Sequence, residues 1–227
     1  PARSGSKRIK DKNILKLKNH PLLAYSIQAA KKSNLFSRII VSTDSLRYKK
    51  IAEKYGAEVP FLRPKKISSD ISYDFEWVKY TIDKLEEKFD FFFILRPTNP
   101  FRNSKTIKKA WNVFKKYNYK FSVRGLSYSK NHPAKMWTRS GKFIEPIMKG
   151  KYKNQPYYNC QFTVLPRILL QNASIEISNS SVLNKNKTIT SNKIVPFIMN
   201  DIEGHDINYI DDFKKISKQK LRYLEEI

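Results

Sequence analysis

The first thirteen residues of the chain combine small side chains with fixed positive charges. Small residues at positions 2, 4, 5 and 6 allow backbone N–H groups to approach a ligand closely. Guanidinium and ammonium groups bind phosphate through charge-assisted hydrogen bonds, so this composition suits a polyphosphate. On composition alone, a disordered basic N-terminus is the competing interpretation. The cationic residues of this charged loop are Arg3, Lys7, Arg8 and Lys12.

A second candidate site lies near the other end of the sequence, at Asp206 and Asn208. Residues two apart on an extended chain point to the same side, so these two side chains can share one cation. Asp211 and Asp212 follow, and the start of a predicted last helix explains them as capping residues. We therefore separate Asp206 and Asn208 from the acidic residues behind them.

His132 and Cys160 carry reactive groups without a recognisable partner in the sequence. His132 precedes a proline, as is common in turns, so a structural role is favoured over that of a catalytic base. Cys160 is the single cysteine, which excludes an internal disulfide, and we interpret it as a packed thiol rather than a nucleophile. With only three histidines, a Cys/His zinc site is not favoured.

Apolar patterns predict the elements that position the charged loop. A helix over 21–30 follows the loop, and a β-branched run over 38–43 predicts a buried parallel strand. Ligands of doubly wound sheets lie beyond the carboxyl ends of strands, so Ser42, Thr43 and Asp44 are expected at the site. Asp44 can equally be the N-cap of a helix over 45–55.

The middle of the chain predicts a strand over 58–62, a helix over 73–88 and the strongest buried strand over 91–95. Two prolines within four residues make the following loop, 96–102, rigid and non-helical. A helix over 104–116, capped by Ser104, and a strand over 120–124 continue a βαβ order. This order implies an α/β class with a mostly parallel sheet.

The βαβ order breaks over 127–171, where short strands, a hairpin and an aromatic stretch are expected. Without a partner, the aromatic side chains would form an exposed apolar patch on a highly charged surface, so we expect this excursion to contact a second subunit. A last helix closes the chain. Its apolar face holds Phe213, Ile216, Leu224 and Ile227.

Composition bounds the class of protein. The chain has 227 residues, 40% hydrophobic, which suits one α/β domain with an excursion. No apolar run is long enough to span a bilayer and no signal peptide is visible, so we expect no membrane insertion and a cytoplasmic location. The net charge of +25 is typical of nucleic-acid binders, but the lysines are spread through every segment. We interpret them as a solvated surface with no specific nucleic-acid site.

The charged loop resembles a signature of the acylneuraminate cytidylyltransferases, the CMP-sialic acid synthetases. Their pattern P-A-R-x-G-S-K-R-x-x-x-K-N matches residues 1–13 in register. In that family the loop wraps the triphosphate of CTP and follows an apolar strand, so we expect a first strand before Pro1. The Ser42 to Asp44 triplet matches the family's S-T-D, and Phe61, Arg63, Pro64 and Asp70 match its next pattern.

Two departures fall in the segment that resembles the family's L-Q-P-T-S-P-L-R. Arg96 stands where glutamine is usual, and Asn99 where serine is usual. The family assigns that glutamine to the sugar substrate, so Arg96 leaves the acceptor open. Further along, Leu169 and Ala173 replace a tyrosine and a glycine of the family pattern. The excursion over 127–171 corresponds to the family's dimer contact and part of its acyl-sugar pocket.

The resemblance implies a Rossmann-like nucleotide-diphosphosugar-transferase fold, a homodimer and a Mg²⁺ cofactor. It implies Arg3, Lys12 and Asp206 as catalytic residues, and Asp206 with Asn208 as metal ligands. The implied acceptor-binding residues are Arg96, Thr98, Asn99, Lys135, Gln161 and Asn172. The implied nucleotide-binding residues are Ala2, Arg3, Ser4, Gly5, Lys7, Arg8, Lys12, Asn13, Ser42, Thr43, Asp44 and Arg63.

The implied reaction transfers CMP from CTP to the anomeric hydroxyl of a nonulosonic acid and releases pyrophosphate. Such a displacement depends on positioning and charge neutralisation. One alternative is a nucleotidyltransferase of the same fold that acts on an eight-carbon keto acid or a polyol phosphate. The other is a non-enzymatic basic protein that binds nucleic acid.

Overall fold

The computed structural model describes residues 1–185, 187–219 and 224–227 of the chain. Its contacts divide the chain into two units, one formed by 1–126 with 172–227 and the other by 127–171. Within the part of the chain that is described, no helix has the length and apolar character needed to cross a membrane.

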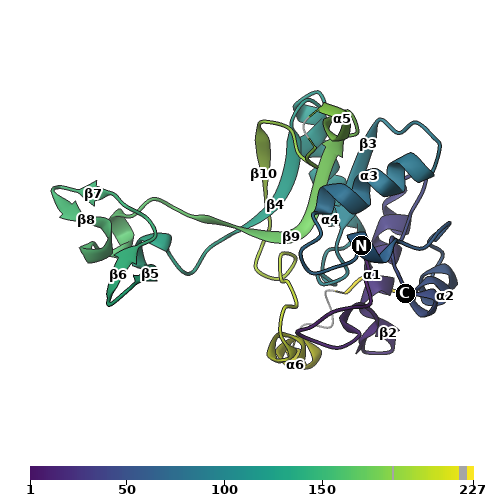
Figure 1. Cartoon of the computed structure of the whole chain (residues 1–227), viewed down its shortest axis with the longest axis horizontal. Coiled ribbons are helices and arrows are strands. Elements are labelled where there is room, and N and C mark those ends of the chain that lie inside the picture. The colour runs from purple at the N-terminus through teal and green to yellow at the C-terminus, as the bar shows by residue number, and fades with distance from the viewer. Residues whose placement is uncertain (186, 220–223) are drawn as a thin grey trace. The chain divides into compact units, whose positions relative to one another are not determined.

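The larger unit is built on a four-stranded sheet in the order β10 (Ile194–Ile198), β4 (Ser122–Tyr128), β9 (Leu169–Asn179) and β3 (Phe91–Leu95) (Figure 1). Strand β10 is parallel to β4, whereas β9 is antiparallel to β3. The reversed strand β9 is the one by which the chain re-enters the sheet after the excursion, so it departs from the βαβ order predicted for the rest.

Helices cover both faces of this sheet. Alternate strand residues form a core with α1 (Leu22–Ser33) and α4 (Ser104–Lys116) on one face. On the opposite face, α3 (Asp74–Lys84) and the short α5 (Val182–Lys185) pack against Ile94 and Phe92. Helix α2 (Leu46–Lys54) forms a separate apolar cluster with α1 and the extended segments beside it.

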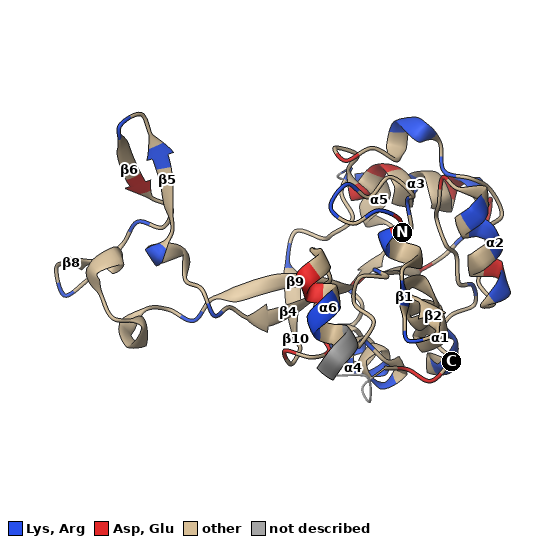
Figure 2. Cartoon of the chain, turned by 90° about the horizontal axis from the view of Figure 1, so that it is seen from below, with Lys and Arg blue, Asp and Glu red and all other residues tan. Residues whose placement is uncertain are grey.

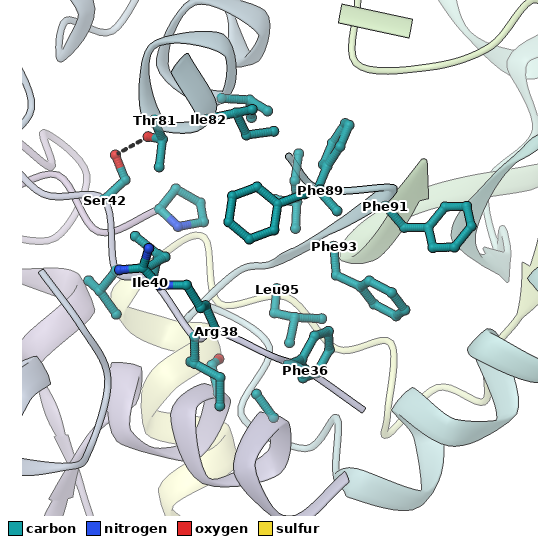
Figure 3. Close-up of a pocket in the computed structure, with 18 of the residues that line it drawn as sticks. Phe36, Arg38, Ile40, Ser42, Thr81, Ile82, Phe89, Phe91, Phe93 and Leu95 are labelled. Carbon is teal, nitrogen blue, oxygen red and sulfur yellow. Dashed lines mark hydrogen bonds between the residues drawn. The ribbon is translucent and has the colours of Figure 1, made fainter. Parts of the chain in front are cut away.

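The predicted strands over 38–43 and 58–62 are wrong as regular strands. Only one parallel bridge, between Ile40 and Glu58, joins them. The other side of the 38–42 segment faces a cavity of about 380 Å³, which β3 borders opposite it (Figure 3). A single isolated bridge does not make a continuous ladder, so neither segment is a regular strand. The strand expected before Pro1 would lie outside this sequence and stays a prediction.

The lining of this cavity is mostly apolar and includes Phe36, Ile40, Phe91, Phe93 and Leu95, as Figure 3 shows. A nucleoside triphosphate needs cations and hydrogen-bond donors around its phosphates. We therefore place the functional site at the charged loop and not in the cavity.

Several helix boundaries differ from the sequence-based expectation. The helix predicted over 73–88 ends at Lys84, shortly before Glu86, which adopts a left-handed φ of 54°. Asn103, not Ser104, caps α4, because its side chain accepts the N–H of Thr106. Helix α6 (Ile210–Gln219) begins as predicted, and the predicted part over 220–223 lies outside the described residues. The end of that prediction is wrong, because Leu224 and Ile227 are described and lie outside any helix.

Short elements complete the larger unit. The 3-10 helix η1 (Lys12–Ile14) is followed by the hairpin strands β1 (Lys16–Leu17) and β2 (His20–Pro21), and η2 (Lys65–Ile67) precedes α3. Ser45 caps α2 by accepting the N–H of Tyr48, so Asp44 is not the helix cap. This outcome leaves the Asp44 carboxylate for the loop.

The unit over 127–171 contains two short hairpins. Strands β5 (Trp137–Ser140) and β6 (Phe143–Pro146) form one, and β7 (Lys151–Tyr152) and β8 (Gln155–Pro156) form the other. The first hairpin turns at Gly141, whose φ of 60° suits glycine. The predicted short strands and hairpin are thus confirmed. Three 3-10 helices flank the two hairpins: η3 (Pro133–Lys135) precedes them, and η4 (Tyr157–Asn159) and η5 (Phe162–Val164) follow them.

Candidate active site

The charged loop is fixed to the end of the extended segment 38–43. The backbone N–H of Ala2 donates to the Ser42 carbonyl at 2.9 Å. The Asp44 carboxylate accepts the backbone N–H of Ser4 at 2.8 Å and the Ser4 hydroxyl at 3.0 Å. Hydrogen bonds to an ionised acceptor are stronger than neutral ones, so Asp44 is the main anchor of the loop's first turn.

The second half of the loop is held from inside. The buried Asn13 donates its amide to the Arg3 carbonyl at 3.0 Å. Asp11, in a left-handed conformation with φ of 54°, accepts the hydroxyl of Tyr48 at 3.0 Å. A Cβ at Gly5 would meet no atom within 4 Å, so the space beside the loop is open to a ligand.

Two cations of the loop share one carboxylate. Arg3 and Lys7 lie 2.5 and 2.6 Å from the two oxygens of Asp70, and Arg3 also donates to the Ser68 carbonyl at 3.3 Å. Hydrogen bonds from Lys7 and Arg3 lower the pKa of Asp70, so it is ionised at neutral pH. Ion pairs at the surface contribute little to stability, and a polyphosphate can take over the same donors.

The other two cations reach the segment 206–208. Lys12 donates to the Ile207 carbonyl at 2.9 Å, and Arg8 donates to the Asn208 carboxamide oxygen at 2.9 Å. Burial lowers the pKa of Lys12, and the charge of Asp206 opposes this shift. The loop and the predicted metal segment, almost two hundred residues apart in sequence, therefore form one site.

The two oxygens of Asp206 differ in their hydrogen bonding among the described residues. The Asn208 amide donates to Oδ2 at 2.7 Å, whereas Oδ1 is buried and has no hydrogen-bond partner among the described residues. A buried polar atom of this kind fits a cation ligand, and carboxylate and carboxamide oxygens suit Mg²⁺. Within the same described residues, no cluster of three or more His, Cys, Asp or Glu side chains is arranged to hold a metal.

Arg63 lies buried beneath the end of the 38–43 segment. Its guanidinium donates to the Ser42 hydroxyl at 3.0 Å and carbonyl at 2.8 Å, and it lies 4.9 Å from the centre of the Trp77 ring. Burial lowers the pKa of Arg63 to about 10, with Asp44 and Asp74 opposing the shift. Arg63 therefore keeps its charge at neutral pH beside the predicted nucleotide site.

The loop 96–102 is clamped by a buried arginine. Arg102 donates to the carbonyls of Ser174 and Arg96 at 2.5 and 3.3 Å and to the Ser26 hydroxyl at 2.7 Å. Burial lowers its pKa to about 9. Three donors on one rigid fork fix the exit of β3 relative to β9 and α1.

Asn99 and Thr98 join this loop to the metal segment. The fully buried Asn99 amide donates to the carbonyls of Asn172 and His205, both at 3.1 Å. The Thr98 carbonyl accepts the N–H of Ile207 at 2.9 Å. The structure thus gives Asn99 a role in holding the site together, since its amide nitrogen is committed to backbone carbonyls.

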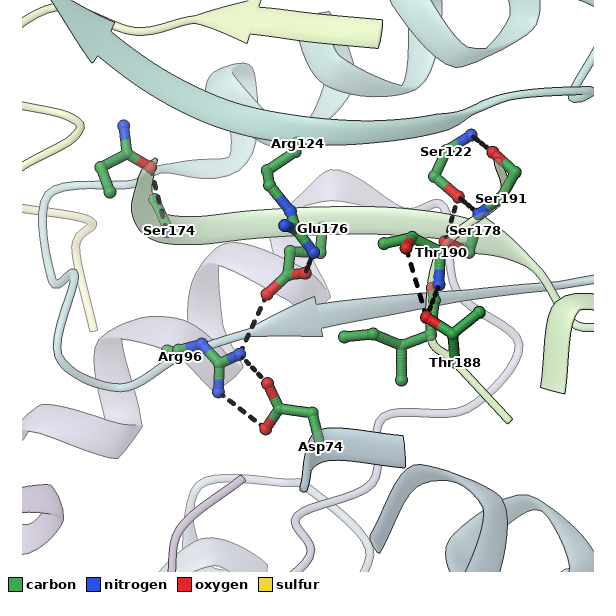
Figure 4. A network of polar contacts seen from close by, with 12 residues as sticks. Asp74, Arg96, Ser122, Arg124, Ser174, Glu176, Ser178, Thr188, Thr190 and Ser191 are labelled. Carbon is green, nitrogen blue, oxygen red and sulfur yellow. Dashed lines mark hydrogen bonds and ion pairs between the residues drawn. The ribbon is translucent and has the colours of Figure 1, made fainter. Parts of the chain in front are cut away.

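Arg96 is part of a network of four charged side chains (Figure 4). It pairs with Asp74 at 2.6 Å and with Glu176 at 2.9 Å, and Glu176 also pairs with Arg124 at 2.7 Å. Burial alone would lower the pKa of Arg96, but the hydrogen bond and charge of Asp74, with Glu176, raise it. Arg96 is therefore permanently charged and already paired.

Two residues predicted to bind the sugar acceptor lie in the unit over 127–171. Lys135 donates to the carbonyls of Tyr158 and Cys160 at 2.7 and 2.5 Å, and Gln161 is exposed at the start of η5. His132 is buried, with one ring nitrogen accepting the N–H of Ala134 at 3.0 Å and the other 2.9 Å from the Pro166 carbonyl. His132 thus caps η3, which agrees with the structural role that the sequence favoured over that of a catalytic base.

Figure 2 shows Lys and Arg residues on many helices, strands and loops of the described chain. The lysine-rich surface predicted from the sequence is therefore distributed. The cations of the charged loop differ from this distributed surface, because oxygen atoms of carboxylate, carboxamide and carbonyl groups fix their positions.

Sequence reasoning missed several residues of the site. Asp70 was identified as matching a family pattern, but no role was predicted for it. Asp74 lies in the first turn of α3, where acidic residues are common, so it gave no functional signal. Trp77 occupies an apolar position of α3 that core packing explains. Glu176 left one usable signal, a charged residue directly between the two isoleucines Ile175 and Ile177.

Solved structures resemble the fold described above. A CMP:2-keto-3-deoxy-manno-octonic acid synthetase complexed with CTP has a TM-score of 0.69 and 13% identity, covering 96% of this chain and 94% of its own. A cytidylyltransferase from Leptospira borgpetersenii has a TM-score of 0.57 and 16% identity, covering 95% and 82%. At such low identity these likenesses show the fold alone, which is the predicted nucleotide-diphosphosugar-transferase type.

Sequence comparison gives the family. A model of the cytidylyltransferase family matches residues 1–142. An N-acylneuraminate cytidylyltransferase from Escherichia coli is 32% identical, covering 100% of this chain and 54% of the relative, so this chain spans about half of that protein. A CMP-N,N'-diacetyllegionaminic acid synthase from Legionella pneumophila is also 32% identical, covering 92% and 88%. The chain belongs to the cytidylyltransferase family, in its CMP-nonulosonic acid synthetase group.

Proposed function

We propose that this chain transfers CMP from CTP to the anomeric hydroxyl of a nonulosonic acid and releases pyrophosphate. The observation that carries the proposal is the charged loop itself. Four cations gather on one loop that Asp44 anchors, and two of them bond to the segment holding Asp206. Relatives named for neuraminic, legionaminic and pseudaminic acids support this class of acceptor.

The reaction is a displacement at phosphorus. The anomeric oxygen forms a bond to the α-phosphorus of CTP, the bond from that phosphorus to the bridging oxygen breaks, and pyrophosphate leaves while the hydroxyl loses its proton. Arg3 and Lys7 neutralise the triphosphate once they exchange Asp70 for phosphate oxygens, and Lys12 lies near the Asp206 end of the loop. Arg63 holds a charge at the nucleotide side of the site.

We also propose that Asp206 holds Mg²⁺, with Asn208 as a weaker or water-mediated partner. The unpartnered buried Oδ1 of Asp206 supports this role. When bound, Mg²⁺ neutralises phosphate charge and lowers the pKa of a coordinated hydroxyl. One protein carboxylate is enough for a Mg²⁺ ion whose other ligands are phosphate oxygens and water.

The acceptor is an acidic sugar, and a basic site suits its carboxylate. In this proposal Arg96 contacts the acceptor, as its position after β3 implies. We further propose a homodimer formed through the unit over 127–171, whose exposed apolar residues include Phe143 at 78% and Ile144 at 60%. We also propose a cytoplasmic location, as the sequence predicts.

A coupled pyrophosphate-release assay tests the function. The purified chain, CTP and Mg²⁺ are incubated with neuraminic, legionaminic and pseudaminic acid derivatives in parallel, and with an eight-carbon keto acid. Controls omit the acceptor or replace CTP with UTP. We expect turnover only with CTP and at least one nonulosonic acid. Turnover with the eight-carbon acid alone would move the acceptor to that class, and no turnover with any acceptor would refute the proposal.

A further inference from the structure

Four charged side chains meet between the sheet and α3. Arg96 follows β3, Asp74 begins α3, Glu176 lies in β9 and Arg124 lies in β4, as Figure 4 shows. Glu176 is at the centre, since its Oε1 accepts from Arg96 at 2.9 Å and its Oε2 accepts from Arg124 at 2.7 Å. Each carboxylate oxygen is thus assigned to one guanidinium group.

Fold stability does not explain this network. Glu176 is only 4% exposed, and its register partner on β3 is Ile94, a core residue. Taking an ion pair out of water costs about as much as the pair regains, so apolar residues of similar size would stabilise the sheet as well or better. A buried carboxylate at this position therefore points to a role for the arginines that it holds.

The network lies between the two parts of the proposed site. On one side, Asp74 accepts the Trp77 indole N–H at 2.9 Å, and the Trp77 ring lies against the Arg63 guanidinium. On the other side, Arg96 belongs to the loop whose Thr98 carbonyl accepts the N–H of Ile207. An acceptor bound between nucleotide and metal therefore meets Arg96.

Arg96 retains donors for such an acceptor. Its Nη2 carries the two short contacts, while Nη1 makes only a 3.4 Å contact to Asp74. Its Nε is buried and has no hydrogen-bond partner among the described residues. A guanidinium binds a carboxylate best through two parallel N–H donors, so the orientation of the guanidinium decides whether it can bind a carboxylate in this way.

We infer that Glu176 is a positioning residue for the acceptor: by fixing Arg96 from β9, it orients the guanidinium toward the carboxylate of the acidic sugar. This inference rests on the proposed function. Arg124 has a supporting part, since it holds the second oxygen of Glu176 and so fixes the direction of the first. Asp74, whose side chain is 35% exposed, holds Arg96 from the side of α3.

The test compares Glu176→Gln with wild type by steady-state kinetics, varying acceptor and CTP separately. The amide keeps the size of the side chain but removes its charge, so Arg96 loses the partner that orients it. We expect the acceptor KM to rise about tenfold or more, the scale of a lost charge-assisted hydrogen bond, while the CTP KM stays within about threefold. Ser178→Ala is the matched control, since Ser178 lies on the same face of β9 and its hydroxyl, among the residues that the structure describes, bonds to Ser122 and to the Ile189 carbonyl rather than to the charged network.

Two further measurements separate orientation from general damage. The ratio of kcat/KM for the acid over its methyl ester should fall in Glu176→Gln and stay at the wild-type value in Ser178→Ala. In an Arg96→Gln background, Glu176→Gln should add at most about threefold to the acceptor KM, because residues that act through one another are not additive. If Glu176→Gln does not fold, Arg124→Gln replaces it and should raise the acceptor KM severalfold.

The outcomes distinguish this inference from the proposed function. A wild-type chain inactive with every acceptor would overturn both. An active enzyme whose Glu176→Gln and Arg124→Gln variants keep the wild-type acceptor KM and acid-over-ester ratio would overturn the positioning role alone. Additive effects of Glu176→Gln and Arg96→Gln would also overturn it.

Discussion

Replacing Asp44 should weaken nucleotide binding without unfolding the protein. In Asp44→Ala, the Ser4 N–H and hydroxyl lose the acceptor that they reach at 2.8 and 3.0 Å. Ala2 keeps its hydrogen bond to the Ser42 carbonyl, so the start of the loop stays attached. The expected effect is therefore a looser turn around Ser4 and Gly5, which CTP must order when it binds.

The magnitude follows from the two hydrogen bonds. A hydrogen bond to a charged group contributes about 1.5–3 kcal/mol. The two bonds share one partly buried carboxylate, so we take about 2–3 kcal/mol for the pair rather than the full sum. If CTP binding must supply this ordering energy, its dissociation constant rises about 30- to 150-fold.

Calorimetric titration with CTP measures this change directly, and thermal unfolding checks that the fold is intact. Ser4→Ala is the matched variant, because it removes only the hydroxyl and keeps the backbone N–H on Asp44. Ser4→Ala should raise the CTP dissociation constant about five- to tenfold, the scale of one hydrogen bond, and should not raise it further in the Asp44→Ala background. Asp44→Ala with CTP affinity within threefold of wild type would refute the anchoring role of Asp44.

Three other predictions concern the metal, acid stability and assembly. Asp206→Ala should lower turnover about a hundredfold or more while CTP still binds. Asn208→Asp should lower the Mg²⁺ concentration that gives half-maximal turnover. Unchanged turnover and Mg²⁺ dependence in Asp206→Ala would place the metal elsewhere. Burial alone would raise the pKa of Asp74, but the hydrogen bond and charge of Arg96, with the hydrogen bond from Trp77, lower it below its ordinary value. The contribution of Asp74 to stability is therefore present above the ordinary aspartate pKa and is lost as the pH falls through the lowered pKa. Asp74→Asn should therefore flatten the acid limb of a plot of unfolding free energy against pH, and an equal slope would contradict this. Sedimentation at micromolar concentration should show a dimer, and a clean monomer would count against contact through 127–171.

The sequence predicted those parts of the protein that local patterns control. Helices α1, α2 and α4 and strand β3 follow from apolar periodicity and from capping or turn residues next to them in the chain. The order of residues 1–13 identified the charged loop, because its spacing is local as well. The excursion over 127–171 was visible as a break in the βαβ order.

Regular strands over 38–43 and 58–62 were the main error of the fold prediction. The two segments do meet, at a parallel bridge between Ile40 and Glu58, but a regular strand needs a continuous ladder with a neighbour on at least one edge. Here one edge of 38–42 borders the cavity next to β3. Pairing across a sheet depends on segments distant in sequence, which a local window does not contain.

The candidate site shows the same division. The sequence by itself determined which residue types are present: the cations of the loop, the Ser42 to Asp44 triplet, Arg96 and Asp206. Only the tertiary structure decided that Asp44 anchors Ser4 and that Arg96 is held by a glutamate eighty residues away. Side-chain charge and backbone propensity are properties of a residue and its neighbours, whereas burial and the choice of ion-pair partner arise when remote elements pack together.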